Sequence, residues 1–134
     1  METAKEELYK NILEKRQRIR EFAEDFIFIF DKNLCARYCN EHAAKHLGCC
    51  PSEVIGKPLS ELFPSNSYQT LKRHLQTVFK SGIPVFSEVR ITFQNIELLL
   101  DSHFSPIRDR DEVTGVLFIS RGLPNTGLRS PSIN

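Results

Sequence analysis

The sequence predicts an α+β fold, in which a five-stranded antiparallel sheet carries short helices on one face and follows an N-terminal amphipathic helix. Two observations support this class. Apolar residues follow a helical period before residue 26, and alternating and helical segments then succeed one another in short blocks. The tail is rich in Gly, Pro, Ser and Asn. We therefore expect a helix over 1–25, a globular domain over 26–123 and a disordered tail over 124–134.

The size and charge of the chain narrow its class. Its 134 residues suit one domain with an appended helix, and 18 basic against 17 acidic side chains give a net charge of +1. This balance argues against binding nucleic acid by phosphate neutralisation. The sequence has neither an apolar run long enough to span a membrane nor a signal peptide. We expect a cytoplasmic protein without nucleic-acid or membrane partners, whose four cysteines stay reduced.

The N-terminal helix, predicted over 3–25, carries an apolar stripe. Thr3 can cap its first turn, and Glu6, three positions on, would complete a capping box. The spacing typical of a coiled coil separates Leu8, Ile12, Ile19 and Phe22. This pattern favours a homodimer through the helix, which also carries the signal. The alternative is a helix that folds onto its own domain.

Two strands and three short helices are predicted next. The apolar run 26–31 and the segment 35–39 form a hairpin around a tight turn. A helix begins after Asn40, whose side chain can cap it. Two more short helices begin near Pro51 and Pro58.

A longer helix and three strands complete the domain. The helix, over about 66–81, ends at Gly82. In the strand 85–93 the odd positions are largely apolar and polar residues alternate with them, which indicates one buried and one exposed face. The last two strands are predicted over 96–107 and 115–121, with a solvated loop between them.

One face of the strand 96–107 is predicted to be polar. Alternation places Glu97, Asp101 and His103 on the same side. We expect this to be the solvent side of the sheet. Leu99 lies among these residues, which suggests that the N-terminal helix or a partner covers part of this face.

Several residues at the ends of these predicted strands and helices occur in a characteristic order along the chain. Asp31 follows the first strand, and Asn40 opens the helix after the second. After them come Ala43, Leu47, Gly48, residues 53–57, residues 105–109, Gly115 and Val116. Together these residues resemble a PAS domain over about 22–123. PAS domains often end in Asp-Ile/Val-Thr, which Gly122-Leu123-Pro124 replaces here, so the N-terminal helix is the better candidate for carrying the signal.

The resemblance implies a sensory or interaction module of a bacterial signalling protein, in which a sheet cups a small pocket. It implies no catalysis, and we expect no catalytic residue. The sequence also lacks a Gly-rich phosphate loop, and it has no pair of carboxylates at a spacing that would indicate an enzyme. A ligand pocket would be lined by Leu71, Leu75 and Val78 from the longer helix and by Val89, Ile91 and Leu100 from strands.

A cluster of thiols and imidazoles near residue 45 raises the hypothesis of a metal site. Cys39, His42, His46 and Cys49 are three, four and three residues apart. Two histidines four residues apart share one face of a helix, where they can bind one metal. The alternative is that these residues pack as ordinary core and surface side chains, because buried thiols behave as small hydrophobes.

His74 raises the hypothesis of a haem ligand. It lies at the edge of the apolar stripe of the longer helix, and haem-binding PAS sensors take their proximal histidine from this helix. An ungapped alignment with the oxygen-sensing type puts that histidine at Leu71 instead. The reactive cysteine motif of flavin photosensors does not follow Gly56. We expect no cofactor, with haem or non-covalent flavin as the alternatives.

These features predict a signalling module that binds a small ligand or mediates dimerisation, and relays the signal to an output domain such as a histidine kinase or a transcriptional regulator. Two alternatives stay open. One is a haem, flavin or metal-binding redox or gas sensor. The other is a ligand-free dimerisation module, which is favoured if the ten phenylalanines fill the core.

Overall fold

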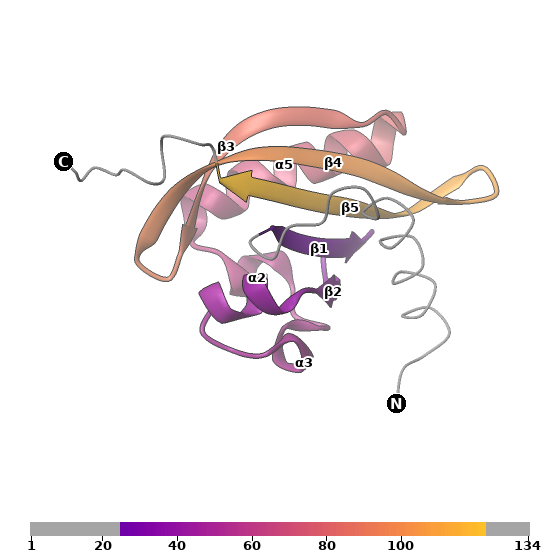
Figure 1. The fold of residues 1–134 in the computed structure, drawn as a ribbon. Coiled ribbons are helices and arrows are strands. Elements are labelled where there is room, and N and C mark those ends of the chain that lie inside the picture. The colour runs from indigo at the N-terminus through magenta and orange to yellow at the C-terminus, as the bar shows by residue number, and fades with distance from the viewer. Residues whose placement is uncertain (1–24, 123–134) are drawn as a thin grey trace.

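A computed structural model describes residues 25–122 of the chain. Five antiparallel strands form one sheet in the order β2-β1-β5-β4-β3, and short helices pack against one face (Figure 1). This confirms the predicted α+β fold. The predicted helix over 3–25, with Leu8, Ile12, Ile19 and Phe22, lies outside the described residues, as does the tail over 124–134.

The bounds of the elements follow the sequence pattern closely. The strands are β1 (Phe26–Asp31), β2 (Ala36–Cys39), β3 (Val85–Phe93), β4 (Ile96–Asp109) and β5 (Glu112–Gly122). The helices are α2 (Glu41–His46), α3 (Pro51–Val54), α4 (Leu59–Leu62) and α5 (Ser65–Ser81). In the part of the chain that the structure describes, no helix is both long and apolar enough to cross a membrane.

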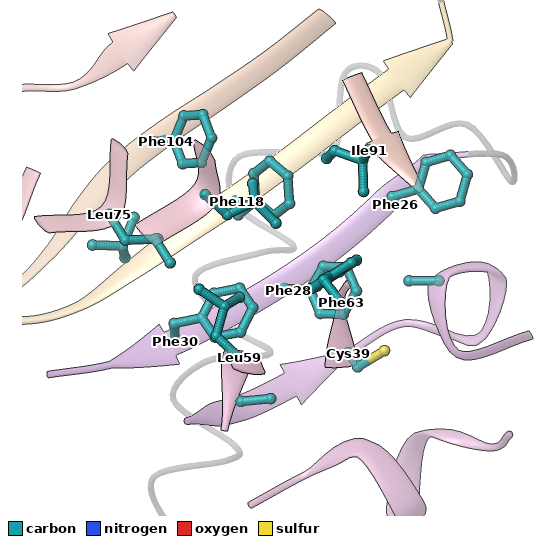
Figure 2. Packing of buried hydrophobic residues seen from close by; sticks show 14 of the residues in the cluster. Phe26, Phe28, Phe30, Cys39, Leu59, Phe63, Leu75, Ile91, Phe104 and Phe118 are labelled. Atoms are coloured by element: carbon teal, nitrogen blue, oxygen red, sulfur yellow. The ribbon is translucent and has the colours of Figure 1, made fainter. Parts of the chain in front are cut away.

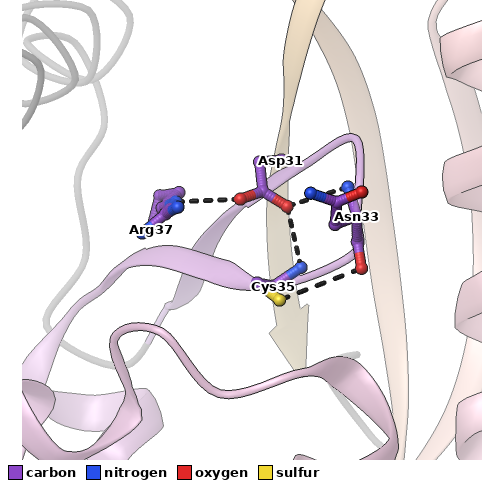
Figure 3. A network of polar contacts seen from close by, with 4 residues as sticks. All are labelled: Asp31, Asn33, Cys35 and Arg37. Carbon is purple, nitrogen blue, oxygen red and sulfur yellow. Dashed lines mark hydrogen bonds and ion pairs between the residues drawn. The ribbon is translucent and has the colours of Figure 1, made fainter.

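The turn between β1 and β2 is held by one carboxylate. Asp31 accepts hydrogen bonds from the backbone N–H groups of Asn33 (2.9 Å) and Cys35 (3.0 Å) (Figure 3). It also pairs with the Arg37 guanidinium, with 2.8 Å between Nε and Oδ2. This arrangement is an Asx-type turn, in which the side chain replaces a backbone partner.

The side chain of Asn40 links helix α2 to the start of strand β1 through hydrogen bonds. Its Oδ1 accepts from the N–H of Ala43 (3.0 Å) and so caps α2, as the sequence predicts. The same oxygen accepts from the N–H of Ile27 (3.2 Å), and its Nδ2 donates to the carbonyl of Asp25 (2.7 Å). One amide side chain therefore fixes the helix on the start of β1.

The hairpin between β4 and β5 is longer than the sequence predicts. The expected loop between residues 107 and 115 is wrong, because both strands continue to a tight turn at Arg110 and Asp111. Arg110 adopts a positive φ of 62°, and the register shifts between Ile107 and Arg108. The hydrophobic pattern does not reveal this extension, since the hairpin end is polar and exposed.

The inner face of the sheet and the helices enclose an aromatic core (Figure 2). Seven of the ten phenylalanines are buried in it: Phe26, Phe28, Phe30, Phe63, Phe93, Phe104 and Phe118. Apolar side chains from α2 to α5 pack against these rings. Burial of these rings and aliphatic side chains is the main stabilising contribution to the fold.

The outer face of the sheet is divided. Over β1, β5 and the far end of β4 it holds a second buried cluster of Ile27, Ile29, Ile107 and Leu117. Over β4 the side chains of Glu97, Asp101 and His103 are exposed, as predicted, and Leu99 is half-buried.

Candidate functional site

The six residues predicted to line a pocket come together between α5 and the sheet. Leu71, Leu75 and Val78 of α5 are completely buried. Val89, Ile91 and Leu100 are at most 3% exposed and belong to the same cluster. The structure thus places all six in one region of the core, in company with the phenylalanines. Their role in holding a ligand stays a prediction.

The register of the sheet aligns large side chains in one row across the inner face. Cys39 lies opposite Phe28, which lies opposite Phe118, which lies opposite Phe104. The stacked rings are 5.9 Å apart between Phe28 and Phe118, and 4.7 Å between Phe118 and Phe104. We call this row, Cys39, Phe28, Phe118 and Phe104, the aromatic rung. Rings in contact at these distances fill the middle of the sheet.

The next row on the inner face is polar. Ser120 lies opposite Ser102, which lies opposite Ser87, and Phe26 lies opposite Ser120 on β1. We call Ser87, Ser102 and Ser120 the serine rung. Ser102 and Ser120 are completely buried, and their Oγ atoms are 2.6 Å apart. Ser102 Oγ also lies 3.4 Å from the carbonyl of Leu100, to which it donates.

Sequence reasoning missed the serine rung. Its signal was present in the alternation, because Ser102 occupies an inward position between Leu100 and Phe104. Ser120 likewise continues the inward positions of Val116 and Phe118. Polar groups so deeply buried satisfy each other by hydrogen bonding, and they are also the groups that could orient a polar ligand in an apolar pocket.

His74 lies at the end of the aromatic rung. Its imidazole ring is 5.0 Å from the Phe104 ring, measured between centroids. Burial, with a contribution from neighbouring Arg73, lowers the pKa of His74 and favours the neutral imidazole. Neutral imidazole is the form that binds haem iron. The contact with Phe104 occupies one flank of the imidazole, so haem ligation stays a prediction that would require this ring to move.

The predicted metal-binding histidines stack on one another. The rings of His42 and His46 are 4.4 Å apart, and both lie within 4.9 Å of the Phe26 ring. His46 Nδ1 is 3.0 Å from the backbone carbonyl of His42. The pair therefore packs against the aromatic core at the start of β1.

Cys39, the first residue of the predicted metal site, is buried. Burial raises the pKa of the Cys39 thiol to about 12, and nearby Cys49 adds in the same direction. Cys39 Sγ donates to the carbonyl of Asn40 (3.3 Å), so its thiol is directed to the backbone. Within residues 25–122, no three His, Cys, Asp or Glu side chains are grouped so that they could hold a metal.

A surface hollow of about 560 Å³ lies away from these residues, where α5 ends beside the turns β1–β2 and β4–β5. Leu34, Phe79 and Val113 supply its apolar lining. Arg108 Nη2 donates to the carbonyl of Gly82 (2.9 Å) across one wall. None of the six residues predicted to line a ligand pocket lines this hollow.

An ion pair joins the two ends of the described chain. Arg121, on β5, makes two hydrogen bonds to the buried Asp25, at 2.8 Å from Nε and 2.9 Å from Nη2. These bonds raise the pKa of Arg121. The two-pronged geometry is the strong form of a guanidinium–carboxylate contact.

A family model of the PAS fold matches residues 7–121, and this chain belongs to the PAS family. The match covers the sheet, the helices and both serine and aromatic rungs. No curated protein matches the chain.

Solved structures share the fold at low sequence identity. The PAS domain of a protein from Colwellia psychrerythraea is 18% identical with a TM-score of 0.67, over 86% of this chain and 99% of that chain. A sensory box sensor histidine kinase from Vibrio cholerae is 17% identical with a TM-score of 0.65, over 90% and 98%. At this level of identity the likeness concerns the fold.

A third similar structure belongs to a larger protein. VqmA from Vibrio cholerae, in a complex with a ligand and DNA, is 18% identical with a TM-score of 0.69 over 85% of this chain. This chain spans 52% of that chain, or about half its length. The expectation that nucleic acid is not a partner gains no support here, because that neighbour is a complex with DNA.

Proposed function

We propose that this PAS domain relays a signal by a change in dimer geometry, without a bound ligand, to an output domain. The observation that carries the proposal is the packed aromatic core. Phe28, Phe118 and Phe104 stack in contact across three strands, and the six predicted pocket residues are buried among such rings. Side chains packed in this way fill the space that a ligand would need.

The relay works by a shift between two arrangements of the dimer. An input transmits nothing unless it favours one arrangement over the other. A rigid core suits this role, because close-packed rings move together and carry a displacement from one element to the next. The Asp25–Arg121 ion pair supports the proposal, since it links the residue before β1 to the end of β5.

The homodimer is proposed to form through residues 1–24. Their sequence carries the apolar stripe of Leu8, Ile12, Ile19 and Phe22. Two of the similar structures support an output domain that follows the PAS domain. One belongs to a sensor histidine kinase, and the other, VqmA, is in a complex with DNA. The domain itself is assigned a signalling role, not a catalytic one.

Sedimentation velocity on the full chain tests the dimer. Ile12→Glu puts a charge into the apolar stripe and is expected to remove the association that runs through this stripe, so that the chain forms smaller assemblies than the wild type at the same concentration. Gln17→Glu adds the same charge outside the stripe and is expected to leave the dimer intact. A wild type that is monomeric throughout, or an Ile12→Glu variant that dimerises like Gln17→Glu, contradicts the proposal.

Native mass spectrometry and an absorption spectrum of freshly purified protein test the absence of a ligand. We expect the mass of the chain alone and no visible absorption, in protein made with haem precursor supplied. A sharp band near 400 nm, lost in His74→Ala, would establish a haem sensor instead. A co-purifying flavin or metabolite would likewise overturn the ligand-free proposal.

A small polar ligand is the second candidate function, and the serine rung favours it. Ser102 and Ser120 place two hydroxyl groups inside an apolar region, the arrangement of a typical ligand pocket. A ligand found by mass spectrometry should then be lost in Ser120→Val and retained in Ser87→Val, whose side chain is only half-buried at the end of the same row. Equal retention in both variants excludes the serine rung as its site.

A further inference from the structure

The two edges of the sheet differ in how their backbone groups are satisfied. The β2 edge is covered by the segment before α4: the N–H of Ala36 donates to the carbonyl of Lys57 (2.9 Å), and Gly56 donates to the carbonyl of Ala36 (2.7 Å). Within residues 25–122, β3 has a single neighbour in the sheet, β4. An edge strand of this kind is a template for pairing with another strand.

The outward backbone groups of β3 can be assigned. The N–H of Thr92 donates to Ser67 Oγ (2.9 Å), so the backbone of Thr92 points away from β4. Both backbone groups of a residue in an antiparallel strand point to the same side, and the side alternates along the strand. The N–H and C=O groups of Phe86, Glu88 and Arg90 therefore point outward from the sheet edge.

The strand itself is regular. The pairing of β3 with β4 runs from Val85 to Phe93 without a shift in register. The pairings β1–β2 and β4–β5 each contain such a shift. β-Bulges and prolines are two of the features that protect an edge strand from pairing, and β3 contains neither.

We propose that β3 pairs antiparallel with β3 of a second copy, with Val89 on the two-fold axis. This register sets Glu88 of each copy directly opposite Arg90 of the other. Both residues carry outward backbone groups, so the two copies can exchange four backbone hydrogen bonds. The side chains of Glu88 and Arg90 are exposed on the outer face, where opposite charges at facing positions attract.

Neighbouring registers are less favourable. Moving the axis to Glu88 sets two glutamates opposite each other, and moving it to Arg90 sets two arginines opposite each other. A register shifted by an odd number of residues sets outward groups against groups that already bond β4. Self-pairing about Val89 is therefore the arrangement that both charge and hydrogen bonding select.

Phe86 gives the same contact an apolar component. Its side chain is 66% exposed and meets the His103 ring edge-on at 4.7 Å. The outward N–H of Thr92 stays bonded to Ser67 Oγ, so the proposed backbone pairing ends at Arg90. Phe86 lies just beyond this pairing, diagonal to Arg90 of the second copy and within reach of its side chain. Pairing would remove part of this exposed ring from water.

This contact is separate from the dimer proposed through residues 1–24. Two different two-fold contacts on one chain extend an assembly beyond a dimer. To isolate the edge contact, the test uses the full chain with Ile12→Glu as background. That background removes association through the N-terminal stripe if the first proposal is correct, and changes nothing if it is not.

Sedimentation velocity across a concentration series then measures self-association of this background chain. Glu88→Arg sets two arginines opposite each other, and Arg90→Glu sets two glutamates together, so each is expected to weaken self-association by about tenfold. A mixture of the two variants restores both attractive pairs and should associate at least as tightly as the background chain. Glu61→Arg, at an exposed position of α4, makes the same charge change away from the edge and is expected to have no effect.

The mixing experiment distinguishes this register from any general effect of charge. Restored association in the mixture, with the double variant Glu88→Arg/Arg90→Glu also associating, supports the pairing. A background chain that does not self-associate overturns it. Single variants that associate like the background, or a mixture as weak as either variant alone, overturn it as well.

Discussion

The aromatic rung and the serine rung are adjacent rows of one sheet, yet they meet the demands of burial in different ways. In the first, Phe28, Phe118 and Phe104 exclude water by stacking in contact. In the second, Ser102 and Ser120 are equally buried and satisfy each other with one short hydrogen bond. The aromatic rung gains stability from apolar area, while the serine rung depends on a hydrogen bond that both partners must keep.

The difference between the two rungs indicates which core residues can be substituted with little loss of stability. Removing a ring leaves a cavity that the surrounding strands cannot fill, whereas removing both hydroxyls leaves only small apolar side chains. A family member could therefore acquire ligand chemistry at the serine rung with little loss of stability. The following predictions test this contrast, from the largest effect to the smallest.

Phe118→Ala is expected to be the most damaging change. It removes the central ring of the aromatic rung, which contacts rings on both neighbouring strands. The expected loss is about 3–5 kcal/mol in the free energy of unfolding, measured by chemical denaturation. Phe86→Ala, at an exposed position, is the control and should cost far less. Equal losses in the two variants would contradict the importance of the rung.

Cys39, at the end of the aromatic rung, should make the domain sensitive to alkali. Burial raises the pKa of its thiol from 9.0 to about 12, so the folded state holds the proton after the unfolded state has lost it. This contribution is complete below about pH 9 and falls by about 1.4 kcal/mol per pH unit as the pH rises toward the folded pKa. Denaturation curves at increasing pH should therefore diverge between wild type and Cys39→Ala.

Cys50→Ala provides the matched control for this measurement, because the Cys50 side chain is exposed. The Cys50 thiol donates to Glu53 (3.3 Å), so a constant offset in stability is expected, but above about pH 9 the variant's loss of stability should run parallel to that of the wild type. A Cys39→Ala variant with the same alkaline loss as the wild type would show that the thiol is not the group responsible.

Ser120→Ala should cost about 1–3 kcal/mol, since it leaves the buried Ser102 hydroxyl without its closest partner. The double variant Ser102→Ala/Ser120→Ala should cost less than the two single variants added together. Denaturation of all four proteins completes a double-mutant cycle. Strictly additive losses would mean that the two hydroxyls do not depend on each other.

Ser87→Ala is expected to change stability by no more than about 0.5 kcal/mol. Its side chain is half-buried, and its hydroxyl makes only a local contact with the carbonyl of Glu88 (3.4 Å). The melting temperature of this variant should match the wild type. A loss as large as that of Ser120→Ala would extend the hydrogen-bonded part of the serine rung to β3.

Most of the fold was predictable because its signals are local. The alternation of 85–93 gave one buried and one exposed face, and Asn40 caps its helix as its residue type suggests. The turn at Arg110 was missed, since its positive φ occurs at a residue type that does not favour it. The polar end of that hairpin also lacks the apolar alternation that marks a strand.

The candidate site was only partly predictable. Leu71, Leu75 and Val78 follow from the stripe of one helix, and they do converge with residues of the sheet. The contact between Ser102 and Ser120 depends on the register of two strands, whose bonded atoms lie 18 residues apart in the chain. No local pattern fixes that register, because it is set by the pairing of the whole β4–β5 hairpin.

The ion pair between Asp25 and Arg121 has a mechanical consequence. It lies where the described chain begins and ends, and β1 and β5 run antiparallel from this point. Tension that pulls these two ends apart acts first on the ion pair and then separates the strands one residue pair at a time, beginning with Phe26 and Ser120. Such a domain opens like a zipper at low force, and its adjacent ends allow it to be inserted into another protein as a cassette.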